Sequence, residues 1–409
     1  MKKIIKDAIR SVSEILGFPW STPKQHPRTQ SDYMFSPVIT DDALTELYER
    51  NQVAHAIVED VAFDALLPFH PVREPGEIID KLDKEINNLY KSFILVPLSR
   101  ALLFTRLYGS AELLIGYSDA KELSTKANKK SKIQYIQAIP KTWVKEIVMK
   151  KDKEGDILLP ASPDYYILNV GSSNIRIDSS RIIHMVNKGV DEVSLSGRSV
   201  LYHVFDLLTI LKSMDWGVGQ AMWRNGGGMT AFIAPEGAEQ EQIDAIDEVV
   251  SDINAKTTLT LIPGTKMESQ KPAALDPEKY YSVLLQQISI GTRIPQSILA
   301  GAQKGTLTAS EKDRRDYYEL LDNIQKTLLS PTLYEIFKKF YESGQLSTSD
   351  FIIEWEKTSI KVLEEAKSEF YYAQAEVQRN IAKREEVLFK QEEIKLKSMK
   401  SKTLNYNKE

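Results

Sequence analysis

Cysteine is absent from the 409-residue chain, and histidine is scarce. Without thiolates, the chain can form neither disulfide bonds nor cysteine-ligated metal sites. None of the histidines lie at the i, i+3 or i, i+4 spacing that starts a zinc site on a helix. The five are His26, His55, His70, His184 and His203. Ordinary core and surface positions explain them, and we expect no metal and no other cofactor.

Long apolar runs and an excess of positive charge are also missing. No uninterrupted apolar stretch reaches the ~18 residues that a membrane-spanning helix needs, so we expect no membrane partner. The formal net charge of −4 argues against a protein that holds nucleic acid over its whole surface. Any contact with DNA is then local or weak.

The first half of the chain combines helices with short strand-like runs. The amino terminus "MKKIIKDAIRSVSEIL" is typical of an amphipathic helix, and an arm rich in Pro, Ser and Gln follows it. Helices are predicted over 41–66, capped by Asp41 or Asp42, over 77–92, and over 96–108 before Gly109. Short β-branched or aromatic runs then predict an antiparallel sheet. These runs are 111–118, 133–149, 164–170, 174–178 and 181–186.

The second half begins with a long helix over 198–225 that three glycines, 226–228, bring to an end. A β-α-β-β insert follows, with strands 229–235, 257–263 and 266–272 and a helix over 238–253. The next helix is capped by Asp276, starts at Pro277 and runs to Arg293, where Ile294-Pro295 breaks it.

The remaining helices are predicted from their caps and apolar stripes. Thr308 and Glu311 form a capping box, so one helix starts at Ala309. Ser330 caps another, which has Pro331 at its first position and ends near Gly344. A strand, 350–356, precedes a last helix, 359–397, whose apolar face comprises Leu363, Ala366, Phe370, Val377, Ile381 and Leu388.

The stretch "LAGAQKGTLTASEKD", 299–313, resembles a phosphate-binding loop only superficially. That motif requires two glycines separated by four residues, then Lys and Ser/Thr, on a turn that leaves a buried strand. Here only three residues separate Gly301 from Gly305, Lys304 precedes the second glycine, and the preceding segment is helical. We therefore expect no nucleotide binding.

Two charged segments have alternative interpretations. The basic loop "DAKELSTKANKKSK" contains no aromatic residue or arginine to stack on a base, so a solvated loop explains it better than a nucleic-acid patch. The runs "DKLDKE" and "DAIDE" carry acids at i, i+3, which a metal-dependent nuclease would need. Both lie on amphipathic helices, so a solvated face explains them better.

Three segments and the order of elements carry a resemblance to a known family. The segments are "ALLFTRLYGSAELLIGY", "IRIDSSRIIHMVN" with "SGRSVLYHVFDLL", and "IPQSILAGAQKGTLTASEKDRRDYYELLDNIQ". In them the chain resembles the portal proteins of tailed bacterial and archaeal viruses. The resemblance implies an α+β, mostly helical fold with the following parts: an N-terminal helix and arm, 1–29; a wing, 30–195 and 309–358; stem helices, 196–228 and 276–295; a clip, 229–275; a tunnel loop, 296–308; a crown helix, 359–397; and a polar tail, 398–409.

The resemblance also implies a function and two sets of site residues. A ring, expected to be a dodecamer, would conduct double-stranded DNA through one capsid vertex of the virion during packaging and ejection. Its implied partners are the terminase large subunit, the major capsid protein or scaffold, and a neck adaptor. The tunnel loop would offer Gly301, Gln303, Lys304, Gly305, Thr306 and Thr308 to DNA. The clip would offer an acidic surface to partners: Glu239, Glu241, Asp244, Asp247, Glu248 and Asp252.

Two other classes of function stay open from the sequence. One is an oligomeric head scaffold or adaptor without a DNA channel, and the other is a metal-dependent enzyme that acts on nucleic acid. A ring with a central hole would separate a portal from both, and for a portal we expect no enzymatic activity.

Overall fold

The computed structural model describes residues 39–73, 78–151, 162–171, 173–187, 195–227, 229–233, 266–270, 277–301, 307–359 and 362–379. The chain divides into two units. Unit 1 comprises Met1–Pro37 and Phe205–Ile288, and unit 2 comprises Val38–Val204 and Ser289–Glu409. None of the helices within the described ranges is both long and apolar enough to cross a membrane.

Unit 2 begins with two helices where the sequence predicted one. They are α3, Asp41–Arg50, and α4, Gln52–Asp64. Asn51 separates them because its extended backbone ends α3 while its side chain caps α4 by accepting a hydrogen bond from the Ala54 N–H. The predicted caps Asp41 and Asp42 are wrong, since both are helical and Thr40 accepts from the Ala43 N–H instead.

A π-helical segment joins the next two helices, α5, Asp80–Leu89, and α6, Leu95–Tyr108, into one continuous element. This segment, Tyr90–Ile94, adds a residue to the turn, which a sequence pattern of period 3.6 does not reveal. Helix α6 ends at Gly109, as predicted, and Gly109 has the left-handed φ of 97°.

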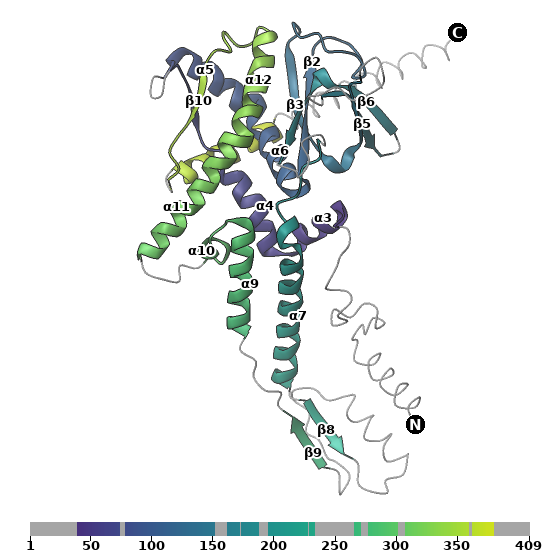
Figure 1. The fold of residues 1–409 in the computed structure, drawn as a ribbon, viewed down its shortest axis with the longest axis vertical. Coiled ribbons are helices and arrows are strands. Elements are labelled where there is room, and N and C mark those ends of the chain that lie inside the picture. The colour runs from purple at the N-terminus through teal and green to yellow at the C-terminus, as the bar shows by residue number, and fades with distance from the viewer. Residues whose placement is uncertain are drawn as a thin grey trace, which may run out of the picture. The chain divides into compact units, whose positions relative to one another are not determined.

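Every run predicted as a strand between 110 and 186 contains a strand, but a 3-10 turn breaks the run 133–149 into two, and the strands form two three-stranded sheets instead of the one predicted (Figure 1). The first has the order β3-β2-β7 and the second the order β4-β5-β6, with every pair antiparallel. The six strands are β2 Ser110–Tyr117, β3 Ile133–Pro140, β4 Val144–Met149, β5 Pro163–Val170, β6 Ser173–Asp178 and β7 Ile182–Val186. Short 3-10 turns carry the chain from β3 to β4 and from β6 to β7, that is, from one sheet to the other.

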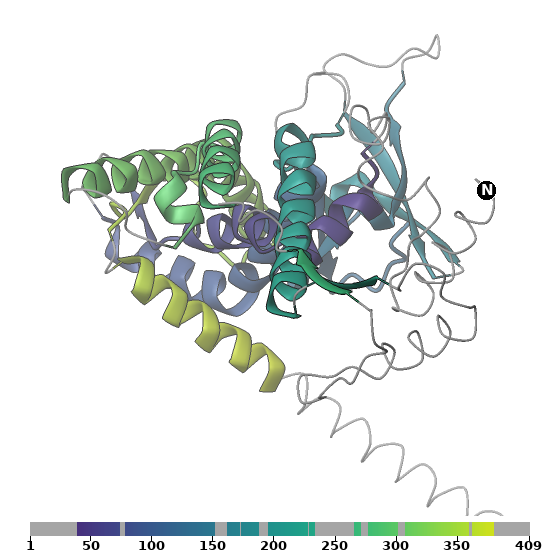
Figure 2. The ribbon, with the colours of Figure 1, turned by 90° about the horizontal axis from the view of Figure 1, so that it is seen from below.

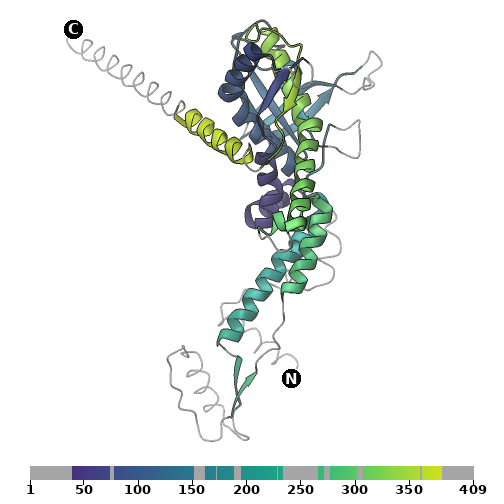
Figure 3. The ribbon, with the colours of Figure 1, turned by 90° about the vertical axis from the view of Figure 1, so that its left-hand side faces the viewer.

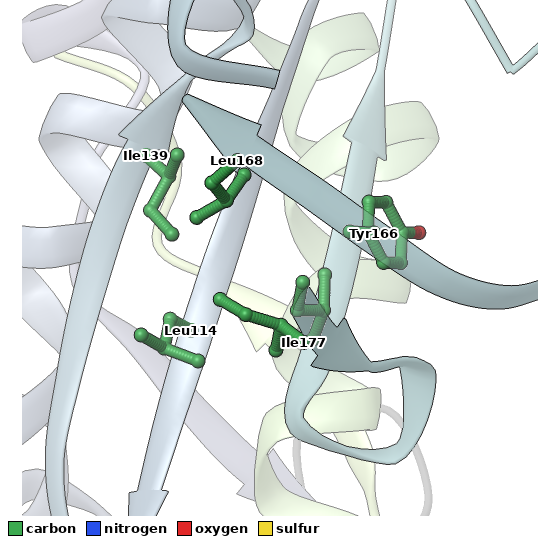
Figure 4. Close-up of a cluster of buried hydrophobic side chains, with 6 residues drawn as sticks. Leu114, Ile139, Tyr166, Leu168 and Ile177 are labelled. Carbon is green, nitrogen blue, oxygen red and sulfur yellow. The ribbon is translucent and has the colours of Figure 1, made fainter. Parts of the chain in front are cut away.

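A buried apolar cluster joins the two sheets (Figure 4). Leu114, Ile139 and Ile182 come from the first sheet, and Tyr166, Leu168 and Ile177 come from the second. Tyr166 and Leu168 lie two residues apart on β5 and therefore share one face, which packs with Ile139 of β3 and so holds the two sheets together. Helix α6 contacts β2 and β3 as well.

A two-stranded sheet joins distant parts of the chain. In it β1, Phe69–Val72, which the sequence did not predict, pairs with β10, Ile352–Trp355. The ring of Phe69 lies 5.0 Å from that of Tyr90 and 5.1 Å from that of Trp355, between ring centroids. This aromatic contact closes the helical core of unit 2.

Helices α11, Leu307–Ile324, and α12, Ser330–Glu342, form one rod through a second π-helical segment, Gln325–Leu329. The predicted N-cap at Ser330 is wrong, because the preceding residue is already helical and the Ser330 hydroxyl accepts a hydrogen bond from the Trp355 indole at 2.9 Å. Gly344, with φ 72°, ends the rod as predicted.

The last described segment of unit 2, 362–379, is helical. Figure 2 shows it in yellow-green, with the green α11 on the opposite side of the purple and blue helices α4 and α5. Of its predicted apolar face, Leu363, Ala366, Phe370 and Val377 are partly buried. Ile381 and Leu388 lie outside the described residues.

Unit 1 contains two long helices and a hairpin-like pair of strands in its described part. The helices are α7, Phe205–Gly227, and α9, Pro277–Thr292, which continues into unit 2; the strands β8, Met229–Ile233, and β9, Lys266–Gln270, pair antiparallel. Helix α7 starts later than the predicted residue 198. Residues Tyr202–Val204 before it form a 3-10 turn, in which the Val204 N–H donates to the Leu201 carbonyl three residues back, so the α-helical pattern begins only at Phe205. The predicted helix 238–253 and strand 257–263 lie outside the described residues.

Candidate functional site: the break between α9 and α11

The predicted break after α9 is present, and its backbone is unusual. Arg293 follows the helix with a φ of 60°, which non-glycine residues rarely adopt. Ile294 is 1% exposed and anchors the turn in the core of unit 2, and Pro295 then caps the short helix α10, Gln296–Leu299. The chain therefore reverses at a fixed, buried point.

Helix α10 is tied to α11 by a side-chain hydrogen bond. The Ser297 hydroxyl donates to the Asp313 carboxylate at 2.5 Å. After α10, the exposed Gly301 has a φ of 60°, and no atom lies within 4 Å of the place where its Cβ would be. Glycine is favoured at this position by the left-handed backbone, not by lack of space.

The predicted loop residues have different outcomes. Gln303, Lys304, Gly305 and Thr306 lie outside the described residues. Thr308 is in the first turn of α11, which begins at Leu307, so the predicted helix start at Ala309 is wrong. An N-cap residue has a non-helical backbone, and Thr308 does not meet that condition.

The predicted clip residues cannot be placed. Glu239, Glu241, Asp244, Asp247, Glu248 and Asp252 all lie outside the described residues.

An open groove of about 880 Å³ lies beside the break, within unit 2. Its charged lining comes from three elements: Arg106 of α6, Arg293 of the break, and a row of acids on α11. The acids are Asp313, Asp316 and Glu319. Two cations and three carboxylates therefore line the same groove, and because their opposite charges largely cancel, the groove attracts a phosphate group only weakly.

Arg106 is the buried member of this set, and sequence reasoning missed it. Its guanidinium donates to the carbonyls of Ile57 and Val58, at 2.6 and 3.2 Å, and its residue is 7% exposed. Burial lowers the pKa of Arg106 to about 10, so the side chain stays charged at neutral pH. In the sequence, the apolar residues on either side of Arg106 in α6 are the feature from which its burial could have been predicted.

The acidic run "DKLDKE" has a structural use. Asp83 accepts from Asn87 and contacts His70 at 3.0 Å, and Glu85 accepts from the Ser347 N–H. Within the part of the chain that the structure describes, no three His, Cys, Asp or Glu residues come together in a way that could hold a metal ion. The second run, "DAIDE", lies outside that part.

A buried ion pair holds the basic loop between β2 and β3 in place. Arg181 and Asp119 form an ion pair at 2.7 Å with side chains only 1% and 2% exposed, and the Asn128 N–H also donates to Asp119. Burial alone would raise the pKa of Asp119, but these hydrogen bonds lower it. Lys129 pairs with Glu342 at 2.9 Å, so the loop serves to connect the sheet to α12.

Comparisons with known proteins show a family match over most of the chain and a similar fold in two structures. A family model described as phage portal protein matches residues 43–377. An uncharacterised protein of Haemophilus influenzae is 20% identical over 341 residues, which cover 80% of this chain and 75% of that protein. Two structures are similar in fold: the neck of a native gene transfer agent (GTA) particle computed with C12 symmetry and the neck of an empty GTA particle computed with C6 symmetry. Their TM-scores are 0.53 and 0.52, and in both the identity is 13% and the match covers 81% of this chain and 88% of the other.

Proposed function

The chain belongs to the phage portal protein family, and we propose that copies of it form a closed ring that conducts double-stranded DNA through one vertex of a viral capsid. The observation that carries the proposal is the family match across 43–377, which includes both helices that flank the break and the break itself. A ring of identical chains needs a heterologous interface that closes by rotation. The C12 symmetry of the similar GTA neck supports twelve copies.

In this proposal, the segment after α10 is the loop that meets DNA. Gly301 supports this role because its left-handed backbone turns the chain away from α10 at an exposed point. Gln303, Lys304, Gly305, Thr306 and Thr308 then contact phosphates without reading bases. One lysine per copy attracts DNA modestly, and the mixed charges of the neighbouring groove add little affinity, so DNA is free to slide.

The other parts take the roles that the family suggests. Helices α7 and α9 are the stem, residues 229–275 are the clip, 30–195 and 309–358 are the wing, and the helix from 359 is the crown. The acids of the clip, among them Asp244 and Glu248, bind a basic surface of the terminase large subunit and later a neck adaptor, with electrostatics setting the association rate. The wing contacts the major capsid protein or its scaffold.

Two measurements test this function in order. Native mass spectrometry and negative-stain images of the purified chain are expected to give a ring with a central hole. A monomer or dimer at every concentration and salt tested would refute the proposal. Given a ring, Lys304→Ala is expected to keep its size and its thermal midpoint and to change DNA packaging or retention, because Lys304 is predicted to lie outside any core and such substitutions usually shift stability by less than about 0.5 kcal/mol.

The same experiments separate the two other classes. A scaffold or adaptor without a channel would give no central hole. We propose no enzymatic role: Asp83, the acid of "DKLDKE" closest to a histidine, is engaged with His70 and Asn87. A nuclease would degrade DNA when Mg²⁺ is added to the ring, and a nucleotide-binding protein would show a thermal shift with Mg-nucleotide that Lys304→Ala removes. We expect neither.

A further inference from the structure

The helical segment 362–379 has one face fixed to unit 2 and one face uncovered. On the fixed face, the rings of Phe370 and Phe63 lie 4.8 Å apart, and Lys367 forms an ion pair with Asp64 at 2.7 Å. Tyr372, which is 76% exposed, lies on the opposite face, and Tyr371, which is 65% exposed, lies at its edge, where it lines a small cavity of the same chain with Phe63 and Phe370. Figure 3 shows the segment, in yellow-green, projecting from the side of unit 2.

An aromatic groove of about 440 Å³ lies next to the same segment. Tyr135 and Trp143 in its lining are 43% and 42% exposed, respectively. Gly116 fixes the first of these, since a Cβ at that position would come within 2.1 Å of the Tyr135 ring. The apolar and aromatic residues that line the groove are Phe93, Val96, Pro97, Phe104, Tyr135, Ile136, Ala138, Pro140, Trp143 and Val377.

The groove and the uncovered face have opposite charge. Among the described residues, the charged ones that line the groove are Lys91 and Arg100, and both are basic. Lys91 already pairs with Glu369 of the same chain at 3.0 Å, so Arg100 is the cation that the groove offers to a partner, and the segment exposes Glu364 and Glu376 near its tyrosines. Tyrosine supplies a large, rigid contact area at low entropic cost, and arginine and tryptophan are the other residues that most often dominate an interface. Both surfaces are therefore aromatic, and Arg100 of the groove is opposite in charge to Glu364 and Glu376 of the segment.

We propose that Tyr371 and Tyr372 of one copy dock in the aromatic groove of the neighbouring copy of this chain. The proposal rests on the ring of the proposed function, in which every copy presents two different surfaces that fit each other. Docking of Tyr372 in the groove of its own chain is ruled out by helix geometry, because the segment borders that groove through Val377, and five residues of helix place Tyr372 about 140° away from it. The interface places Glu376 of one copy beside Arg100 of the next.

The first test removes the tyrosines. For the double variant Tyr371→Ala/Tyr372→Ala, mass photometry measures the chain concentration at which half of the chains are assembled into rings. We expect that concentration to rise about tenfold or more above the wild-type value, because the variant loses one interface hot spot. Tyr341→Ala is the matched control, because that tyrosine is 47% exposed on α12 and lies outside the proposed interface. An unchanged thermal midpoint of the dissociated chain confirms that the variants fold.

The second test exchanges charges between the two surfaces. Arg100→Glu and Glu376→Arg are each expected to weaken assembly, while the chain that carries both, and an equal mixture of the two single variants, recover it. Native mass spectrometry should show that the mixed rings contain the two chains in equal numbers, as alternation requires. If the tyrosine variant assembles like the wild type, or if the mixture stays as weak as its components, this interface is refuted although the ring stands. If the wild type forms no ring at all, the proposed function fails first.

Discussion

Replacing Gly197 with alanine would make the new methyl group clash with backbone atoms of neighbouring segments. The new Cβ would lie 2.1 Å from the Gly109 oxygen and 2.2 Å from the Asn187 oxygen, whereas real Cβ contacts are essentially never shorter than 3.0 Å. Neither oxygen belongs to a flexible side chain, and the Gly109 carbonyl also accepts the Asn187 N–H at 2.8 Å. The backbone must therefore move by about 1 Å, which overpacks the junction of α6, β2 and the segment before α7.

The expected cost follows from these two contacts. Overpacking of this kind costs about 1–3 kcal/mol, and loss of the Asn187 to Gly109 hydrogen bond adds about 1 kcal/mol. A total of about 2–4 kcal/mol lowers the thermal midpoint of a unit of this size by roughly 5–15 °C. Circular dichroism of the purified variant measures the shift directly.

A second glycine provides a control with the opposite sign. Gly217 lies inside α7 with no atom within 4 Å of its Cβ position, so Gly217→Ala should stabilise the chain by up to about 1 kcal/mol. Should Gly197→Ala melt within about 2 °C of the wild type, the close approach of Gly109 and Gly197 would be wrong.

Three further substitutions test the ion pairs of unit 2. Burial alone would lower the pKa of His70, but its contacts with Asp83 and Glu356 raise it. The stabilisation from these contacts is therefore complete below the pKa of the unfolded state and is lost as pH rises through the pKa of the folded state. The drop in thermal midpoint caused by His70→Gln should be largest near pH 6 and shrink toward pH 9. Arg181→Met leaves the Asp119 carboxylate buried without its cation and should lower the free energy of unfolding, measured by chemical denaturation, by about 3–5 kcal/mol. The double variant Arg181→Met/Asp119→Ala should recover part of that loss, and equal stability of the single variant and wild type would contradict the buried pair. Lys367→Met should make 362–379 more sensitive to limited proteolysis without changing the midpoint of unit 2, and equal cleavage rates would show that the Asp64 pair does not hold the segment.

The elements that sequence predicted well carry their signals locally. Strands β2 to β7 are short β-branched or aromatic runs between turn residues, and Gly109 marks the end of α6 because only a left-handed residue fits there. The break after α9 follows from Pro295, which disfavours a helical conformation in the residue before it. The family resemblance rested on these same segments.

The elements that sequence missed depend on distant partners or on local exceptions. Strand β1 has only four residues, and its partner β10 lies at the other end of unit 2. Asn51 has a low helix propensity and is a preferred N-cap residue, but the apolar spacing continues on both sides of it, so only its side-chain bond to Ala54 shows that one helix ends there and the next begins. Ser330 has the sequence of a cap, but the π-helical segment before it continues the helix and leaves its hydroxyl for Trp355.

The groove beside the break was equally beyond sequence reasoning. Arg106, Arg293 and Asp313 are far apart in the chain, and nothing in the residues around them indicates that they line one space. Gly301 has the left-handed backbone that glycine favours, and the contacts of the predicted loop residues with DNA remain predictions.

The pairing of β1 with β10 determines when unit 2 can fold during synthesis. His70 and Glu356, which come together at this sheet, are 286 residues apart. At about 5–20 residues per second, the ribosome needs roughly 15–60 seconds between them. Until then Phe69 has neither Trp355 nor Phe337 to pack against, and β1 is an open edge that invites degradation or wrong pairing. A chain released before residue 352 therefore never completes its core, and an assembling ring receives only copies whose translation passed that point.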